Sequence, residues 1–534
     1  MVNKTIFGRG QSASASSAPV ADTINNAGGK AYQYSDKHAL AQIACTNTFN
    51  GTFYADAQAN YDLAKKAVDN LKGDPEFLAK VAVYARDKGY MKDMPSFLCA
   101  MLAALDKKLF RKVFRRVVDN GKMLRNVIQI ARSGGAGKVY NMSSGTFRNA
   151  IQEWFDKRNG YSIFRASVGN DPSMRDILRM SRPKPNTPDK EALFGYLIGK
   201  DVSVDSLPQI VQEYEAYKKD KSLPVPNVDF RFLDSLGIPD SAWIEIARNA
   251  GWTMTRMNLN TFARHGVFKN AEVTKIVADR LKNREEIVKA KVFPYQLLQA
   301  FKSVGSDVPF IVKDALQSAM EISIENVPSF PGQVYVAVDV SGSMSGASVT
   351  GNRGSATSAT RCIDVAGLFG AAVMRRNPSA DVIPFDTRVH THSLNWRDSV
   401  MTNATDLAKF GGGGTDCGLA IAHLNAKQAK GDAIIFVSDN ESWVDGGYRG
   451  QATKMMAEWS KFVARNPKAK LVCIDLSPID NSQVKSEKPN ILQVGGFSDQ
   501  VFEVVNSFLK HGHESDHWVS IIEAIDLDAA PEKV

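Results

Sequence analysis

The amino-acid sequence predicts a long α-helical array followed by a doubly wound α/β domain. Between about residues 38 and 325, apolar side chains recur at i, i+3 and i+4, the spacing of amphipathic helices, with almost no strand-like alternation. Beyond residue 331, β-branched runs of strand length alternate with helical stretches, which is typical of a parallel sheet covered on both faces. The charge divides at the same place, because residues 1–330 carry a net +13 and residues 331–534 a net −4. A polyanionic partner is therefore expected for the helical part alone.

The helical part is predicted to span residues 31–328, after a flexible lead-in over residues 1–30 that contains the small, polar run 11–19. Helices are expected within 54–71, 76–90 and 96–106, and glycines and prolines separate them. Because the helices are short, closely joined and without a shared repeat signature, an irregular α-solenoid of HEAT type is predicted. A set of unrelated helical bundles is the alternative that this pattern leaves open.

The α/β domain is predicted to span residues 329–534. Its strands are expected within 333–343, 380–389, 432–442 and 470–478. Its helices are expected within 360–376, 418–429 and 451–466. Ligands of doubly wound sheets bind outside the carboxyl ends of the strands, so the polar residues at those ends are candidates for a site.

Oxygen-bearing side chains gather at the ends of the predicted strands. The first strand runs into Asp339-Val-Ser341-Gly-Ser343, and the third ends at Asp439. Four glycines precede Thr415 and allow a close approach, because glycine adopts positive φ. Two carboxylates and three hydroxyls form an all-oxygen set that suits Mg²⁺. This ion usually retains some of its water ligands and takes a further ligand from a binding partner. The sequence therefore predicts a divalent-cation site that stays attractive to an outside acidic group.

The densest positive charge lies in an amphipathic segment over residues 107–118. One side is an apolar stripe, and the other carries six basic residues, Lys107, Lys108, Arg111, Lys112, Arg115 and Arg116. No acidic residue within the segment compensates this charge. An uncompensated cationic ridge favours a phosphate backbone as its partner, and an ordinary solvated helix face is the alternative.

A second cationic stretch follows between residues 138 and 184. It predicts further RNA-binding positions at Lys138, Arg148, Arg165, Arg175, Arg182 and Lys184. Aromatic side chains are interleaved with these cations, namely Tyr140, Phe147, Trp154, Phe155, Tyr161 and Phe164. Some belong to the core, and those that are exposed are expected to stack on unpaired bases.

Other features of the sequence restrict the function. The five scattered cysteines predict free thiols in a reducing compartment, and no apolar run reaches the roughly 18–20 residues that cross a bilayer. A cytoplasmic protein is therefore expected. No nucleophile elbow or zinc-protease helix is present, and Asp339 and Asp439 are too few carboxylates for a two-metal nuclease. We accordingly predict no catalytic residues and no enzymatic activity.

In order along the chain, several stretches resemble the Ro ribonucleoprotein autoantigens, a family that joins a TROVE domain to a von Willebrand factor A-like domain. They include NTFNGTFYADAQ at 47–58, RDILRMSRPKP at 175–185, WTMTRMNLNTFARHGVF at 252–268, VAVDVSGSM at 336–344 and FVSDNES at 436–442. The resemblance implies a ring of HEAT-like helices closed by the A-like domain. It also implies that the predicted cation site is a metal-ion-dependent adhesion site, formed by Asp339, Ser341, Ser343, Thr415 and Asp439.

By the same resemblance, Arg165, Arg175, Arg182 and Lys184 match basic positions that contact RNA, and Arg256 and Arg264 in the stretch 252–268 are added to the predicted RNA-binding set. Family members often carry His at the position of Arg182, and the family's basic cluster after Arg165 is replaced here by ASVGNDP. Arginine at position 182 keeps the positive charge without the pH sensitivity of His, whereas the ASVGNDP stretch lacks the family's basic side chains.

The function implied by the resemblance is noncoding-RNA binding in RNA quality control. Y RNA is expected on an outer basic surface, single-stranded ends of misfolded RNA in a central hole, and an exoribonuclease as a protein partner, with no DNA or membrane partner. Two other functions remain open from the residues alone. One is a metal-dependent adhesion or assembly module without RNA, and the other is a Mg²⁺-dependent hydrolase.

Overall fold

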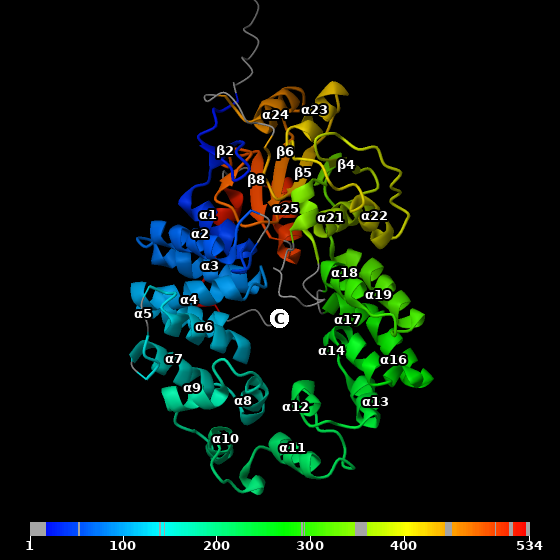
Figure 1. Ribbon diagram of the computed structural model, residues 1–534. Helices are drawn as coiled ribbons and strands as arrows, with labels where there is room; N and C mark the ends of the chain where they lie inside the picture. The colour runs from blue at the N-terminus through cyan, green and yellow to red at the C-terminus, as the bar shows by residue number, and fades with distance from the viewer. Residues whose placement is uncertain are drawn as a thin grey trace, which may run out of the picture. The chain divides into compact units, whose positions relative to one another are not determined.

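The computed structural model describes residues 18–51, 54–137, 140–143, 145–289, 292, 294–347, 360–443, 451–496, 498–511 and 516–529. Contacts along the chain divide it into two compact units. The first unit comprises residues 1–46, 50–63 and 327–521, and the second comprises residues 47–49, 64–326 and 522–534. Figure 1 labels most of the elements of both units.

A five-stranded, fully parallel sheet forms the centre of the first unit, in the order β4-β3-β5-β6-β8 (Figure 1). These strands are β3 (Val334–Asp339), β4 (Asp381–Phe385), β5 (Ala433–Ser438), β6 (Lys470–Asp475) and β8 (Ile491–Gly495). Their residues are almost all buried, as expected when helices cover both faces. The predicted doubly wound sheet is confirmed, although the sequence did not reveal β8.

A second, three-stranded antiparallel sheet also belongs to the first unit and was not predicted. It consists of β1 (Thr23–Ile24), β2 (Lys30–Gln33) and β7 (Asn481–Ser482) in the order β1-β2-β7. Strands of two to four residues are too short to show a period in the sequence.

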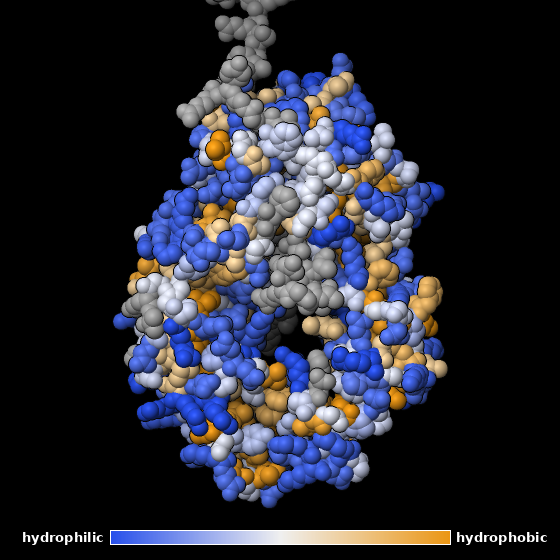
Figure 2. Space-filling view, in the orientation of Figure 1, coloured by the Kyte–Doolittle hydropathy of each residue, from blue (hydrophilic) through white to orange (hydrophobic). Residues whose placement is uncertain are grey.

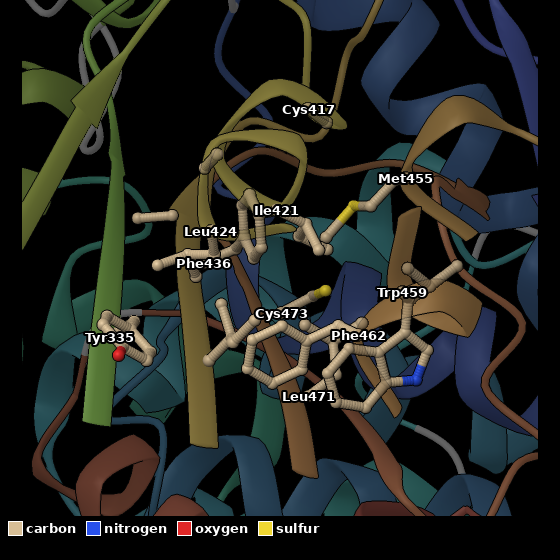
Figure 3. Close-up of a cluster of buried hydrophobic side chains, with 14 of the residues drawn as sticks. Tyr335, Cys417, Ile421, Leu424, Phe436, Met455, Trp459, Phe462, Leu471 and Cys473 are labelled. Carbon is tan, nitrogen blue, oxygen red and sulfur yellow. The ribbon is translucent and has the colours of Figure 1, made fainter. Parts of the chain in front are cut away.

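The helices of the first unit surround the parallel sheet. They are α1 (Asp36–Thr46), α20 (Gly342–Gly346), α21 (Cys362–Arg376), α22 (Val400–Leu407), α23 (Leu419–Ala426), α24 (Lys454–Arg465), α25 (Asp499–His511) and α26 (His517–Glu523), the last of which ends in the second unit. Figure 3 shows Ile421 of α23 and Trp459 of α24 lying over Phe436 and Leu471 of the sheet. The helices predicted within 360–376, 418–429 and 451–466 are thereby confirmed.

The named secondary-structure elements in the described part of the second unit are all helices or 3₁₀ turns. Its helices are α3 (Pro75–Asp87), α4 (Asp93–Leu105), α5 (Lys107–Val117), α6 (Gly121–Ser133), α7 (Gly145–Asp156), α8 (Gly160–Ala166), α9 (Met174–Ser181), α10 (Pro188–Ile198), α11 (Gln209–Lys219), α12 (Phe230–Asp234), α13 (Asp240–Asn249), α14 (Trp252–Met257), α15 (Leu259–Arg264), α16 (Ala271–Leu281), α17 (Arg284–Lys289), α18 (Pro294–Ser303) and α19 (Phe310–Ser323). Three 3₁₀ turns lie at Val204–Ser206, Val267–Lys269 and Ile324–Asn326, and α2 (Ala57–Asn70) begins in the first unit. Most helices contact helices that lie one or two places away in the chain order; for example, α3 contacts α4, α4 contacts α6, and α7 contacts α9.

The boundary of the units differs from the linear division that the sequence suggested. Residues 31–46 were expected in the helical array, but β2 pairs with β7 and the hydroxyl of Tyr34 donates to Asp475 Oδ2 at 2.7 Å. At the other end, residues 522–534 belong with the helical unit, where Lys80 Nζ donates to the backbone oxygen of Glu523 at 2.9 Å. Pairings over more than 400 residues leave no local trace in a sequence. Within the described residues, we find no helix with the length and apolar character that crossing a membrane requires.

Candidate metal centre and basic surface

Two neighbouring strands of the parallel sheet bring Asp339 and Asp439 to one edge of the first unit. Asp339 is the last residue of β3, and Asp439 follows the last residue of β5. The register pairs Val338 with Val437, so both strands reach the same level where the carboxylates begin. Both side chains are fully buried. The predicted convergence of these two carboxylates therefore agrees with the register of the strands.

Two of the predicted hydroxyl groups lie beside the carboxylates, since Ser341 is hydrogen-bonded to Asp339 and Ser343 to Asp439. The backbone N–H of Ser341 donates to Asp339 Oδ1 at 2.9 Å, and Ser341 Oγ lies 3.2 Å from Ser343 Oγ. Ser438, which the sequence did not single out, donates from its Oγ to Asp339 Oδ2 at 2.6 Å. Thr415 is buried on the loop that follows the glycine run.

The glycine run brings its loop against the Asp339 motif for steric reasons. The N–H of Gly342 donates to the oxygen of Gly413 at 2.7 Å. A Cβ on Gly413 would lie 2.4 Å from Asp386 Oδ2, so no larger residue fits there without displacing that carboxylate. Gly412 has φ +130°, a conformation that side chains disfavour. The close approach of the Thr415 loop therefore depends on these glycines.

The electrostatics of this cluster fit a divalent cation. Burial raises the pKa of Asp339, and the neighbouring charge of Asp439 raises it further. Burial also raises the pKa of Asp439, and its Oδ2 atom has no hydrogen-bond partner among the described residues. Two adjacent buried carboxylates with an unpartnered oxygen require either protons or a cation. The described part of the chain has no group of three or more His, Cys, Asp or Glu suited to a metal, so a cation held by these two carboxylates would need the neighbouring hydroxyls as further ligands.

The N-terminal turn over residues 25–29 holds the loop that follows Asp439. Asn26 Nδ2 donates to Glu441 Oε1 at 2.8 Å, and the N–H of Ala27 donates to Glu441 Oε2 at 3.1 Å. Asn25 Nδ2 donates to the oxygen of Ser442 at 2.8 Å. Sequence reasoning missed these residues, because the turn lies more than 400 positions from the loop it supports.

Tyr54 is a further residue of this cluster that sequence reasoning missed. Its hydroxyl is hydrogen-bonded to Ser343, and the carboxylates of Asp339, Asp439 and Glu441 are near enough to affect its titration. Burial, with the charge of these carboxylates, raises the pKa of Tyr54 to about 12. The tyrosine therefore remains neutral at physiological pH. The signal for it was the stretch 47–58, which carried the family resemblance without a chemical role.

Asp475, at the end of β6, predicts an unusual dependence of stability on pH. Burial raises its pKa to about 8, whereas an Asp in an unfolded chain titrates near ~3.9. Between these values the folded chain holds a proton that the unfolded chain has lost, so stability falls as pH rises from about 4 to 8. We expect Asp475→Asn to remove the share of this decline that Asp475 contributes, so that the dependence on pH becomes shallower, and to gain on the order of 1–3 kcal/mol relative to wild type between pH 5 and pH 8.

Urea unfolding in the presence of a chelator measures this effect. Asp480→Asn, a change at a partly exposed residue nearby, is the matched control and should keep the wild-type pH dependence. Parallel pH profiles for Asp475→Asn and wild type would contradict the prediction.

Helix α5 in the second unit is the predicted cationic helix. Asp106 begins it, because its Oδ1 accepts from the N–H groups of Lys108 and Leu109 at 2.7 and 2.9 Å. The apolar side is buried, through Phe110, Val113, Phe114 and Val117. Figure 2 shows a largely hydrophilic surface over the neighbourhood of α5, α7 and α9. The predicted amphipathic helix is confirmed.

The prediction that nothing compensates the charge of α5 is wrong. Arg115 Nε lies 2.8 Å from Glu153 Oε1, Lys112 Nζ lies 2.6 Å from Asp528 Oδ1, and Arg116 Nη2 lies 2.6 Å from Asp87 Oδ2. The sequence hid these pairs because the acids come from α7, the C-terminal residues and α3. Three α5 cations have no ion pair with a described residue, and all three are exposed: Lys107, Lys108 and Arg111.

The second cationic stretch forms an exposed set on neighbouring helices of the same unit. Contacts join α5 to α7, α7 to α9, and α10 to both α8 and α9. Arg182 ends α9 in the left-handed conformation (φ 47°), and its backbone oxygen accepts from Gln152 Nε2 on α7 at 3.1 Å. Five cations here are exposed and make no ion pair with a described residue: Arg148, Arg165, Arg175, Arg182 and Lys184.

The other predicted RNA-binding residues, Lys138, Arg256 and Arg264, do not belong to this exposed set. Lys138 lies outside the described residues. Arg256 is partly buried and its Nη1 donates to the oxygen of Gln296 at 3.0 Å, so it joins α14 to α18 within the fold. Arg264 is exposed at the end of α15 and lines a cavity of about 750 Å³ with Lys269 and Asp307.

The interleaved aromatics are mostly core residues. Phe147, Trp154, Phe155 and Phe164 are buried, Tyr140 is partly buried, and Tyr161 is exposed. Of this set, only Tyr161 is exposed enough to stack on a base without rearrangement.

Known protein families match both the sheet-containing part and the helical part of the chain. The model of the Ro60 vWA domain matches residues 333–509, and the model of the TROVE domain matches residues 192–326. The protein named RNA-binding protein RO60 in Deinococcus radiodurans is 24% identical over 528 residues, which cover 91% of this chain and 95% of the relative. The Caenorhabditis elegans protein of the same name is 25% identical over 271 residues, covering 48% of this chain and 40% of the relative.

A solved structure has the same fold. The crystal structure of the Deinococcus radiodurans RO (RSR) protein superposes with a TM-score of 0.61 at 18% identity, over 89% of this chain and 99% of that one. The parallel sheet with its Asp339 and Asp439 loops lies within the Ro60 vWA match, and about the C-terminal half of the helical unit lies within the TROVE match. The chain therefore carries the two domains of Ro proteins, TROVE and a Ro60-type von Willebrand A domain, and is similar over most of its length to a bacterial RO60 protein.

Proposed function

We propose that this protein binds noncoding RNA through exposed cations of its helical unit. One observation carries the proposal: Arg148, Arg165, Arg175, Arg182 and Lys184 are exposed on contacting helices and make no ion pair with a described residue. Guanidinium groups in such a set suit the phosphate backbone, to which Arg donates in a bidentate manner. Relatives of the chain are named RNA-binding proteins, which supports the same function.

The RNA that we propose is a structured noncoding RNA of the Y RNA type, with single-stranded ends of misfolded RNA as a second class of ligand. Lys107, Lys108 and Arg111 would extend the surface along α5, which contacts α7. Exposed Tyr161 would provide a ring for one unpaired base. An exoribonuclease that trims such ends is the protein partner that fits this role in RNA quality control.

Isolation of the protein from its own cells, followed by sequencing of the bound RNA, tests this proposal. We expect enrichment of one or a few structured RNAs over a mock purification, and binding of such an RNA in vitro that weakens steeply with salt because phosphate contacts release counterions. Absence of enriched RNA, together with no binding in vitro at low salt, would overturn the proposal.

We also propose that the cluster around Asp339 holds Mg²⁺ or another divalent cation. Its orphaned Asp439 Oδ2 atom and its two buried carboxylates support this. Ser341, Ser343 and Thr415 would complete the protein ligands. The bound ion would offer a remaining position to an acidic group of a protein partner, as the adhesion hypothesis also expects.

A further inference from the structure

The C-terminal acidic segment, residues 523–529, lies along α5 in the second unit. It contains Glu523, Asp526 and Asp528 and no basic residue. Lys112 Nζ lies 2.6 Å from Asp528 Oδ1, and Arg116 Nη1 donates to the backbone oxygens of Asp526 and Ala529 at 3.0 and 3.2 Å. Two cations of the predicted RNA-binding helix are therefore engaged by the chain's own C-terminal residues.

Arg116 is the anchor of this contact. Its side chain is only 10% exposed, and its Nη2 also pairs with Asp87 Oδ2 on α3 at 2.6 Å. Asp526 Oδ1 accepts the N–H of Asp528 at 2.8 Å, which forms a turn. Because of this turn, the oxygens of Asp526 and Ala529 both reach one guanidinium nitrogen.

A cavity of about 560 Å³ lies beside this contact. It is lined on one side by the acidic segment, through Leu527, Asp528 and Ala529, and on the other by α5 and α7. The cationic lining residues are Lys112, Arg115, Arg116, Lys157 and Arg158. The acidic segment thus forms one wall of a hollow whose other wall carries five cationic side chains.

The segment is held weakly enough to be displaced. The side chain of Asp528 is 73% exposed, and solvent-exposed ion pairs shift an equilibrium by no more than about fivefold. Leu527 and Ile525 are only partly buried, and the other residues of the segment after Glu523 are exposed. The hydrogen bond from Lys112, together with the charges of Lys112 and Lys108, lowers the pKa of Asp528, so its carboxylate stays ionised at physiological pH.

We propose that the C-terminal acidic segment competes with RNA for the Lys112 and Arg116 side of α5. The inference rests on the proposed RNA-binding function and assigns a regulation to the same surface. The carboxylate of Asp528 and the two backbone oxygens present to α5 the kind of acceptors that an RNA backbone presents. RNA phosphates reach Lys112 and Arg116 only when the segment has moved away. The segment therefore lowers the affinity for RNA, and it lowers most the affinity for RNA that binds through phosphate contacts alone.

Two variants of the full chain test the competition, with a fluorescent RNA hairpin carrying a single-stranded tail as the probe. Asp528→Asn removes the ion pair with Lys112, and a chain ending at Ile525 removes the whole contact. We expect tighter binding by about threefold for Asp528→Asn and by about tenfold for the truncated chain at low salt. The slope of log Kd against log salt should steepen by about one to two in the truncated chain, because freed cations contact phosphates and release counterions.

A double-mutant cycle attributes the effect to the contact. In a Lys112→Gln background, Asp528→Asn should leave RNA affinity unchanged, since its partner is already absent. Asp314→Asn, which removes one exposed negative charge from α19 of the same unit, is the matched control and should change affinity by less than about 1.5-fold. Thermal unfolding shows whether the truncated chain is folded. If it is not, the double-mutant cycle alone still tests whether the acidic segment competes with RNA.

The outcomes separate this inference from the function on which it rests. Equal RNA affinity for wild type, Asp528→Asn and the truncated chain overturns the competition and leaves RNA binding intact. Binding by the truncated chain without binding by wild type supports it. No RNA binding by wild type or any variant overturns the proposed function, and the competition with it. An equal gain from Asp314→Asn shows a bulk charge effect and overturns the competition alone.

Discussion

Replacement of Arg165, Arg175 and Arg182 together by Glu is expected to weaken binding of a structured RNA by about 100-fold or more at moderate salt. All three are exposed and make no ion pair with a described residue, so the change removes phosphate contacts without breaking the fold. Each lost contact should also reduce the salt slope by about 0.9, because fewer counterions are released. Fluorescence anisotropy over a range of salt concentrations measures both quantities.

Arg115 is deliberately absent from this set. It pairs with Glu153 through Nε at 2.8 Å, and reversal of its charge would place two carboxylates side by side. A loss of RNA binding in that variant would therefore not distinguish a contact from a disturbed helix pair.

The control for the triple variant changes the net charge by the same amount elsewhere in the helical unit. Lys219, Lys275 and Lys289 are exposed and lie on α11, α16 and α17. Their joint replacement by Glu should weaken binding by less than about tenfold, through the general field alone. If both triple variants lose affinity equally, the RNA surface is not the one formed by α7 to α10.

A divalent cation is expected to stabilise the wild-type protein by about 3 kcal/mol at a concentration 100 times its Kd. Asp339→Asn should abolish this stabilisation, because the cation loses one of its two buried carboxylates. Without metal the order is reversed, and Asp339→Asn should equal or exceed wild type in stability. The reason is that burial and the charge of Asp439 both oppose ionisation of Asp339 in the absence of a cation.

Thermal unfolding with Mg²⁺, with Mn²⁺ and with a chelator shows whether the order of stability of wild type and Asp339→Asn reverses when the metal is removed. Calorimetric titration with Mn²⁺ gives the affinity for the metal directly. Asp398→Asn, at an exposed position of the same unit, should retain the full response to metal. The affinity should also fall as the pH is lowered, since protons compete for carboxylates whose pKa values are raised. A metal response that survives Asp339→Asn would place the ion elsewhere.

The relation between sequence and structure differs between the two sites. The pattern of strands ending in Asp339 and Asp439 predicted their convergence, because the carboxyl ends of neighbouring parallel strands must meet at one edge. The same reasoning could not find Asn26 or Tyr54, which reach the site from the N-terminal region of the chain. The boundary of the two units was missed for the same reason, since β2 pairs with β7 across some 450 residues.

By itself, the sequence determined the two kinds of architecture, the oxygen-bearing side chains at the strand ends and the amphipathic character of α5. These properties are local, because they follow from side-chain periodicity and from residues adjacent in the chain. Only the tertiary structure decided which cations are available to a partner. Lys112, Arg115 and Arg116 are paired with Asp528, Glu153 and Asp87, whereas Arg175 and Arg182 are not paired with any described residue. An ion pair acts over a few ångströms of space whatever the separation in sequence, so a count of charges along the chain cannot distinguish a free cation from a paired one.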